Sequence, residues 1–190
     1  MTAELVIVRH ADTDWTASGQ HTGRTDLPLN DAGRAKALGL RRLLGGRSFA
    51  AVWSSPLSRA RETADLVGFT PQHRPELVEW DYGDYEGLTT PQIREQRPDW
   101  DLWRDGCPDG EDAAAVGTRA DAVLAMLPPR GDVVVFSHGH MLRVLTARWL
   151  GLPAADGALF ALAPGAVGVL GHEQARRVLA AWGPPGVVAR

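Results

Sequence analysis

Two stretches of the sequence place a histidine directly after a run of β-prone apolar residues. Leu5 to Val8 lead into Arg9 and His10, and residues 133–137 lead into His138. A buried parallel strand delivers the residues that follow it to the carboxyl edge of an α/β sheet, where ligands bind. An arginine and imidazoles gathered there would offer several hydrogen-bond donors to a tetrahedral anion, as phosphoryl transfer requires. The pattern therefore indicates a phosphate site.

A second source of positive charge is Arg59, which lies with Arg61 in the first turn of a helix expected from Leu57 to Val67. Arginine is unfavourable there because the helix macrodipole is positive at its amino terminus, so an early arginine beside free backbone amides suggests that an anion binds. Taken alone, either arginine could equally be a solvated surface residue. Residues two apart on a helix point in different directions, so we expect only Arg59 to face the phosphate.

Two other chemistries are less well supported. His138 with His140, or His10 with Asp12, could contribute metal ligands, but neighbouring arginines would oppose a cation, so we expect no metal and no other cofactor. Cys107 stands between a glycine and a proline with no strand before it, so it lacks the context of a nucleophilic thiol.

The segment Glu79–Gly87 alternates acidic and aromatic residues, a pattern that fits neither a core strand nor a plain solvated loop. It lies in a loop-rich region, residues 71–110, and long loops in compact domains are usually lids or binding walls. Residues 19–26 form a second polar loop flanked by glycines, which can approach a ligand closely. We expect both loops to border the site.

Hydrophobic periodicity predicts the elements that position these residues. Residues 11–15 show no helical period and are expected to form a loop. Strands are expected at residues 5–8, 49–53 and 132–137, with a hairpin from 167–170 to 178–182. Helices are expected at residues 31–44, 57–67, 111–127 and 141–150, with a short one starting at Pro91. This order predicts an α/β fold, a three-layer α/β/α sandwich whose mostly parallel central sheet has an antiparallel edge.

Composition limits the function classes. With 190 residues, 44% of them hydrophobic, we expect one domain over residues 1–190, with 183–190 as a frayed tail. The net charge of −3 argues against nucleic acid or an anionic membrane as a partner. A single cysteine rules out an internal disulfide and fits the cytoplasm, and no segment approaches membrane-spanning length. A homodimer is left open.

The motifs, taken in order, resemble the histidine phosphatase (phosphoglycerate mutase-like) superfamily. The blocks that carry the resemblance span nearly the whole chain: Val8–Ala11, Thr22–Leu29, Ser55–Ala64, Gly83–Gly87 and Ser137–Gly139. Within the superfamily, residues 79–87 and 103–111 are similar to the branch that holds actinobacterial acid phosphatases and fungal sedoheptulose-bisphosphatases.

The resemblance implies a role for each matching residue. His10 would be the nucleophile, with Arg9, Arg59 and His138 forming the phosphate pocket. Glu79 would be the proton donor, with Asp81 and Glu86 as alternatives. The expected substrate contacts are His21, Thr22, Gly23, Tyr82 and Gly139.

The implied activity is a metal-independent phosphomonoesterase that acts on small sugar or carboxylate phosphates through a phosphohistidine. One alternative is a cofactor-dependent phosphoglycerate mutase, although such mutases look longer. Another is a phospho-ligand-binding module without turnover. Its only support is Ala11, where the family usually has glycine. If that position needs a positive φ or a close phosphate approach, the methyl group would cost about 1 kcal/mol or some affinity.

Overall fold

The computed structural model describes residues 3–44 and 46–183. Its six-stranded sheet has the order β3-β2-β4-β1-β5-β6. The strands are β1 (Leu5–Arg9), β2 (Ala51–Ser54), β3 (Gln72–His73), β4 (Val133–Ser137), β5 (Val167–Glu173) and β6 (Arg176–Gly183). The first four strands pair in parallel, while β5 runs antiparallel to both β1 and β6. The predicted mostly parallel sheet with an antiparallel edge is confirmed.

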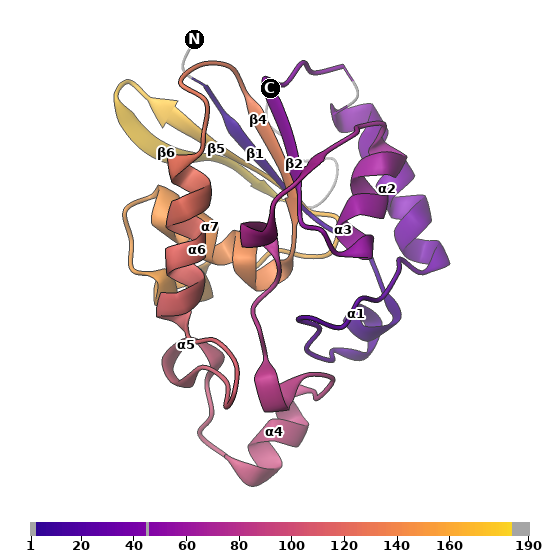
Figure 1. The fold of residues 1–190 in the computed structure, drawn as a ribbon, viewed down its shortest axis with the longest axis vertical. Helices are drawn as coiled ribbons and strands as arrows, with labels where there is room; N and C mark the ends of the chain where they lie inside the picture. Colours follow the sequence, from indigo (N-terminus) through magenta and orange to yellow (C-terminus); the bar gives the residue numbers. More distant parts are fainter. Residues whose placement is uncertain (1–2, 45, 184–190) are drawn as a thin grey trace.

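Helices cover both faces of this sheet. The longer ones are α2 (Asp31–Leu44), α3 (Ser58–Val67), α6 (Ala113–Ala125) and α7 (Gly139–Trp149). The pair α2 and α3 packs on one face, and α6 and α7 pack on the other (Figure 1). The short helices α1 (Asp14–Ser18), α4 (Thr90–Gln96) and α5 (Leu102–Asp105) gather beyond the carboxyl end of β1. Short 3₁₀ helices lie at Pro75–Leu77, Gly83–Tyr85 and Ala154–Leu159.

The central strand β1 is buried on both faces. Leu5 and Ile7 belong to the core shared with α6 and α7, whereas Val6 and Val8 belong to the core shared with α2 and α3. All four side chains are at most 1% exposed, and full burial of each is worth about 1.5–3 kcal/mol. The strand is therefore held firmly in place, which fixes the position of the residues that follow it.

Helix α1 was not predicted from the sequence, and helix α7 begins two residues earlier than predicted. Residues 11–15 are not all loop, because α1 starts at Asp14 behind a capping box in which the hydroxyls of Thr13 and Thr16 accept each other's backbone N–H. Helix α7 starts at Gly139 rather than Met141, with His138 as its N-cap. The apolar pattern marks where α7 enters the core, whereas its first turn lies outside that pattern.

Smaller differences occur elsewhere. The second strand starts at Ala51 rather than Phe49, and the two-residue β3 and the four-residue α5 were not predicted. The tail expected from residue 183 starts too early, since Gly183 pairs with Val167 in β6; residues 184–190 lie outside the described residues. No helix in the described part of the chain is long and apolar enough to span a membrane.

Candidate active site

The two histidines that follow strands lie side by side. β1 and β4 are neighbours and run parallel, with Arg9 opposite Ser137, and the backbone N–H of His10 donates to the carbonyl of Ser137 over 2.8 Å. The ring centroids of His10 and His138 are 5.1 Å apart. The structure thus brings these two imidazoles together at the carboxyl edge of the sheet.

His10 is held as a neutral imidazole with a defined tautomer. Its Nδ1 lies 2.7 Å from the carbonyl oxygen of Ala11. A carbonyl can only accept, so Nδ1 carries the proton and Nε2 keeps its lone pair. Burial, together with the charges of Arg59 and Arg9, lowers the pKa of His10 well below 6.5. Nε2 is therefore available as a nucleophile.

Ala11 causes no strain beside this nucleophile. Among the described residues, the non-glycine positions with positive φ are Asp109 and Gln174, so Ala11 has an ordinary backbone conformation. Its methyl group is fully buried in a small core cluster with Leu29 and Ala37. The penalty that a positive φ would bring is therefore absent, whereas an effect of the methyl group on phosphate approach stays a prediction.

Arg59 is fully buried and bonds mainly to the protein. Its Nε donates to Nδ1 of His138 over 3.2 Å, and its two Nη atoms donate to the carbonyls of Thr22, Gly23 and Thr25 at 2.8–3.1 Å. Four of its five N–H groups are used in this way, which leaves one on Nη1. Arg59 therefore ties α3 both to the loop at residues 22–25 and to His138.

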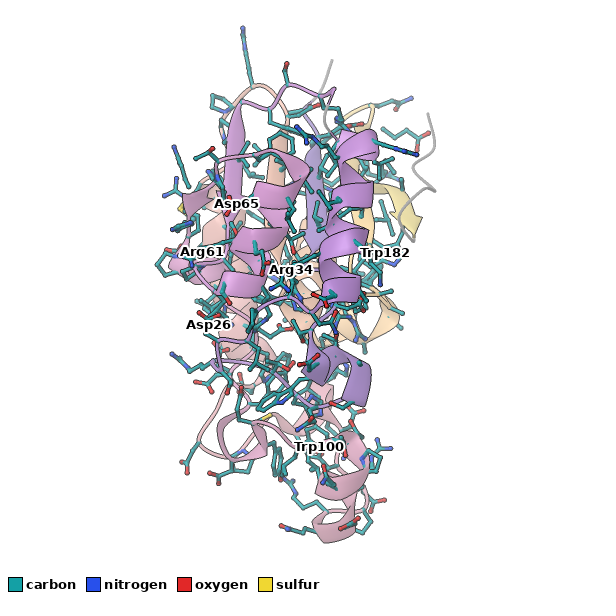
Figure 2. All side chains as sticks on the ribbon, turned by 90° about the vertical axis from the view of Figure 1, so that its right-hand side faces the viewer. Asp26, Arg34, Arg61, Asp65, Trp100 and Trp182 are labelled. Carbon is teal, nitrogen blue, oxygen red and sulfur yellow. The ribbon has the colours of Figure 1, made fainter. Side chains whose placement is uncertain are left out.

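The anion expected at the start of α3 is supplied by the chain. Oδ1 of Asp26 accepts from both the backbone N–H and the hydroxyl of Ser58 at 2.7 Å. Figure 2 shows Asp26 at the start of α3, with Arg61 and Asp65 on the outer side of the same helix. The backbone amide at this helix start, which the sequence suggested would bind an anion, therefore already binds the carboxylate of Asp26.

His138 lies behind His10 with both ring nitrogens engaged. Because Nδ1 accepts from Arg59, the proton sits on Nε2, which lies 2.8 Å from Oγ of Ser55. Burial and the charge of Arg59 lower the pKa of His138 well below 6.5. His138 therefore supports His10 as a neutral group.

A cavity of about 180 Å³ opens in front of His10. Six of the residues predicted for the site line it: Arg9, His10, His21, Thr22, Glu79 and Tyr82. Five further lining residues were not predicted as substrate contacts: Trp15, Thr16, Gly19, Gln20 and His140. A larger cavity, about 700 Å³, lies at the opposite end of the sheet, away from these groups.

Arg9 depends on Gly139 for its position. A Cβ atom at Gly139 would lie 3.0 Å from Cζ of Arg9, so a larger residue there would require the guanidinium to shift from its place over the start of α7. Nη1 of Arg9 donates to the carbonyl of Leu162, and Nε is buried without a hydrogen-bond partner in the described structure. Gly139 therefore lies beneath Arg9 and not in the cavity wall.

Glu79 is held by three backbone N–H groups. Oε1 accepts from Trp80 and Met141 at 2.9 and 2.8 Å, and Oε2 accepts from His140 at 3.1 Å. Two of these amides belong to the first turn of α7, whose unpaired N–H groups favour a carboxylate. Oε1 uses both lone pairs, whereas Oε2 keeps one free in a residue that lines the cavity.

The two alternative acids hold loops in place. Asp81 pairs with Arg24 and also accepts the N–H of Gly83, and Glu86 accepts the N–H groups of Gly23 and Thr25. Neither carboxylate lines the cavity. A Cβ atom at Gly23 would come within 2.6 Å of the carbonyl of Trp80, so this glycine permits close packing between the loops.

The remaining reactive side chains do not form another centre. The described residues hold no group of three or more His, Cys, Asp or Glu that could bind a metal ion. Cys107 is buried, and burial raises the pKa of its thiol to about 12, which makes it a poor nucleophile. His140, considered from the sequence only as a metal ligand, instead lines the cavity beside Tyr82.

Comparisons with known proteins agree with this geometry. A family model described as "Histidine phosphatase superfamily (branch 1)" matches residues 5–184. The chain is 44% identical to an acid phosphatase of Mycobacterium tuberculosis, with 96% of this chain and 93% of that protein covered. It is 36% identical to sedoheptulose 1,7-bisphosphatase of Saccharomyces cerevisiae, with 80% and 69% covered. A solved structure of a Mycobacterium tuberculosis open reading frame is 42% identical and superposes with a TM-score of 0.91, over 97% of this chain and 98% of that one.

Proposed function

Because the chain belongs to the histidine phosphatase superfamily (branch 1), and is thus a phosphatase, we propose that it hydrolyses small phosphate monoesters through a phosphohistidine on His10. The observation that carries this proposal is the tautomer of His10. Its Nδ1 donates to the carbonyl of Ala11, which leaves the lone pair on Nε2, and His10 lines the cavity together with Arg9 and Glu79.

In the first step, Nε2 of His10 attacks phosphorus in line with the ester oxygen. Glu79 enters this step with a proton on Oε2, the oxygen that has a free site beside its bond to His140. The N–P bond forms as the P–O bond breaks, and Glu79 gives that proton to the departing alkoxide. Arg9 neutralises the charge on the phosphoryl oxygens. We propose that the remaining N–H on Nη1 of Arg59, whose other N–H is bound to Thr25, donates to one of the same oxygens.

In the second step, water attacks the phosphohistidine. Glu79, now without its proton, takes one from that water, and the P–O bond that forms replaces the N–P bond. Inorganic phosphate leaves, and His10 and Glu79 return to their starting states. The positive charge that this reaction needs comes from arginines, so we propose that activity requires no metal and survives EDTA.

The names of the relatives support a substrate among small phosphorylated metabolites, sugar phosphates in particular. We propose the cytoplasm as the location, since the chain has one cysteine and that thiol is free. A phosphoglycerate mutase would instead need 2,3-bisphosphoglycerate and would return the phosphoryl group to its substrate.

The test is to trap the intermediate. Rapid acid-free quenching of wild-type protein with ³²P-labelled substrate should leave one acid-labile phosphate on His10, and the His10→Ala protein should carry none. Stoichiometric label on His10→Ala, or a turnover that depends on 2,3-bisphosphoglycerate, would overturn the proposal.

A further inference from the structure

Tyr82 and His140 form a hydrogen-bonded pair in the wall of the cavity. Oη of Tyr82 lies 2.6 Å from Nδ1 of His140, and both residues line the space in front of His10. The reaction proposed above uses only the backbone N–H of His140, which holds Glu79. The imidazole itself has no role in those two steps, although it borders the region where the leaving group must lie.

The pair determines which nitrogen of His140 carries a proton. In the described structure Nδ1 is the only hydrogen-bond partner of the Tyr82 hydroxyl. Burial raises the pKa of Tyr82 and lowers that of His140, so the phenol stays protonated and the imidazole stays neutral. With Nδ1 accepting from Tyr82, the imidazole proton sits on Nε2. The one side-chain hydrogen bond of His140 in the described part of the chain is made by Nδ1, so Nε2–H is left for a ligand.

We propose that the Nε2–H group of His140 donates a hydrogen bond to a hydroxyl oxygen of the leaving group, and that Tyr82 is the positioning residue that sets this tautomer. The inference rests on the proposed phosphomonoesterase function and adds a specificity-determining residue to it.

The surroundings favour a neutral hydroxyl over a carboxylate as the partner. His140 is neutral because burial lowers its pKa, so its Nε2–H can bind a hydroxyl oxygen without supplying the positive charge that burying a carboxylate requires. His21, whose ring centroid lies 4.7 Å from that of Tyr82, is also kept neutral because burial lowers its pKa. Among the described residues that line the cavity the only cation is Arg9, which the proposed reaction assigns to the phosphoryl oxygens, so the part of the wall formed by Tyr82 and His140 offers polar groups without a cation of its own.

The experiment compares two substrates of equal chain length. Glycerol 3-phosphate carries a hydroxyl on the carbon next to the phosphoester carbon, and n-propyl phosphate carries none. The readout is the ratio of their kcat/KM values, which cancels general damage to the phosphate site. His140→Phe should lower this ratio about fivefold to tenfold, the effect of one neutral hydrogen bond.

Conservative variants locate the donor on the ring. A glutamine side chain can place an N–H near the position of Nε2, whereas asparagine places one near Nδ1, so His140→Gln should restore part of the ratio and His140→Asn should not. Tyr82→Phe should lower the ratio in the wild-type background but not in His140→Phe, because it acts through His140. His73→Phe, the same change at an exposed histidine of β3, is the matched control.

The outcomes separate this inference from the proposed function. If wild type releases phosphate from neither ester nor from 4-nitrophenyl phosphate, the phosphatase proposal itself fails. If it releases phosphate and His140→Phe leaves the ratio unchanged, the donor role is wrong. Preference for 3-phosphoglycerate over glycerol 3-phosphate, lost in His140→Phe, would show that the wall recognises a carboxylate and would overturn the choice of a hydroxyl.

Discussion

The guanidinium of Arg59 connects the loop at residues 22–25 with His138. It bonds to three carbonyls of the loop at residues 22–25 and to His138, which leaves one N–H on Nη1 unused in the described structure. Arg61, two residues later on α3, is exposed. The burial of one arginine and the exposure of the other follow from the helix period, since positions two apart face different directions.

Replacing Arg59 should therefore harm the enzyme far more than replacing Arg61. Arg59→Ala leaves three carbonyls and Nδ1 of His138 without a donor, so we expect kcat/KM to fall by at least about 10²-fold and the free energy of unfolding to fall by about 2–4 kcal/mol. Arg61→Ala should change either quantity little. Steady-state kinetics and urea unfolding measure both, and Arg59→Lys tests the forked geometry with the charge retained. Equal losses at the two positions would contradict the network.

Glu79→Gln should distinguish substrates by their leaving groups. An alkoxide is a strong base that needs a proton as the ester bond breaks, whereas 4-nitrophenolate departs without one, so a loss of about 10²–10⁴-fold should appear only with sugar phosphates. Single-turnover rates are required, because Glu79 is also expected to act on water in the second step. Equal loss with both esters would mean that Glu79 serves only to hold the first turn of α7.

A site residue could be predicted from the sequence only where the residues next to it in the chain mark it. His10 and Arg9 stand at the end of an apolar strand, so local pattern was enough to find them. The unusual composition of residues 79–87 marked that segment, but the choice of Glu79 within it came from the family resemblance, with Asp81 and Glu86 as alternatives. The position of His140 in the wall depends on Tyr82, 58 positions earlier in the chain, and on where α7 begins. No local pattern encodes that contact.

At the level of elements, the site is assembled by carboxylates that join loops to helix starts. Glu79 binds the first turn of α7, Asp26 binds the start of α3, and Glu86 binds the loop amides of Gly23 and Thr25. The sequence predicted these helices from their apolar faces but placed the start of α7 two residues late. A first turn fixed by a distant carboxylate has no apolar periodicity to reveal it.

Loosening the loop at residues 19–26 should weaken substrate binding. The carboxylate of Glu86 accepts the backbone N–H groups of Gly23 and Thr25. In Glu86→Gln a single amide oxygen must accept both, and the new amide NH₂ group lies beside N–H donors to which it cannot bond. We expect KM to rise severalfold with a smaller change in kcat, and stability to fall by about 1–2 kcal/mol. Asp84→Asn, at an exposed carboxylate of the same segment, is the control. A fall in kcat with unchanged KM would instead place Glu86 in the chemistry.

For the whole molecule, the burial of neutral histidines has opposite consequences for activity and for stability in acid. It keeps the nucleophile uncharged, but it lowers the free energy of unfolding. His10 and His138 are 3% and 0% exposed, and burial lowers the pKa of each well below 6.5. In the native protein His10 thus stays a neutral nucleophile in mildly acidic solution. The unfolded chain protonates the same two residues near pH 6.5. Below that pH the unfolded state binds more protons than the native state, so acid favours unfolding.

The stability of the protein should therefore fall as the pH drops from 7.5 to 5.5, while the nucleophile remains uncharged. Each buried histidine contributes about 1.4 kcal/mol over that interval, so His10 and His138 together lower the free energy of unfolding by about 3 kcal/mol. Carboxylates such as Asp105, whose pKa is lowered from 3.8 by its hydrogen bond to Arg104, act only at more acidic pH. Urea unfolding at pH 7.5, 6.5 and 5.5 measures the effect. His140, whose pKa burial also lowers well below 6.5, adds a similar share, so His10→Gln should remove at most about a third of the pH dependence. His73→Gln, at an exposed site, should leave it intact. Equal stability at all three pH values would mean that the unfolded and native chains bind the same number of protons, and hence that His10 and His138 are not held neutral by the fold.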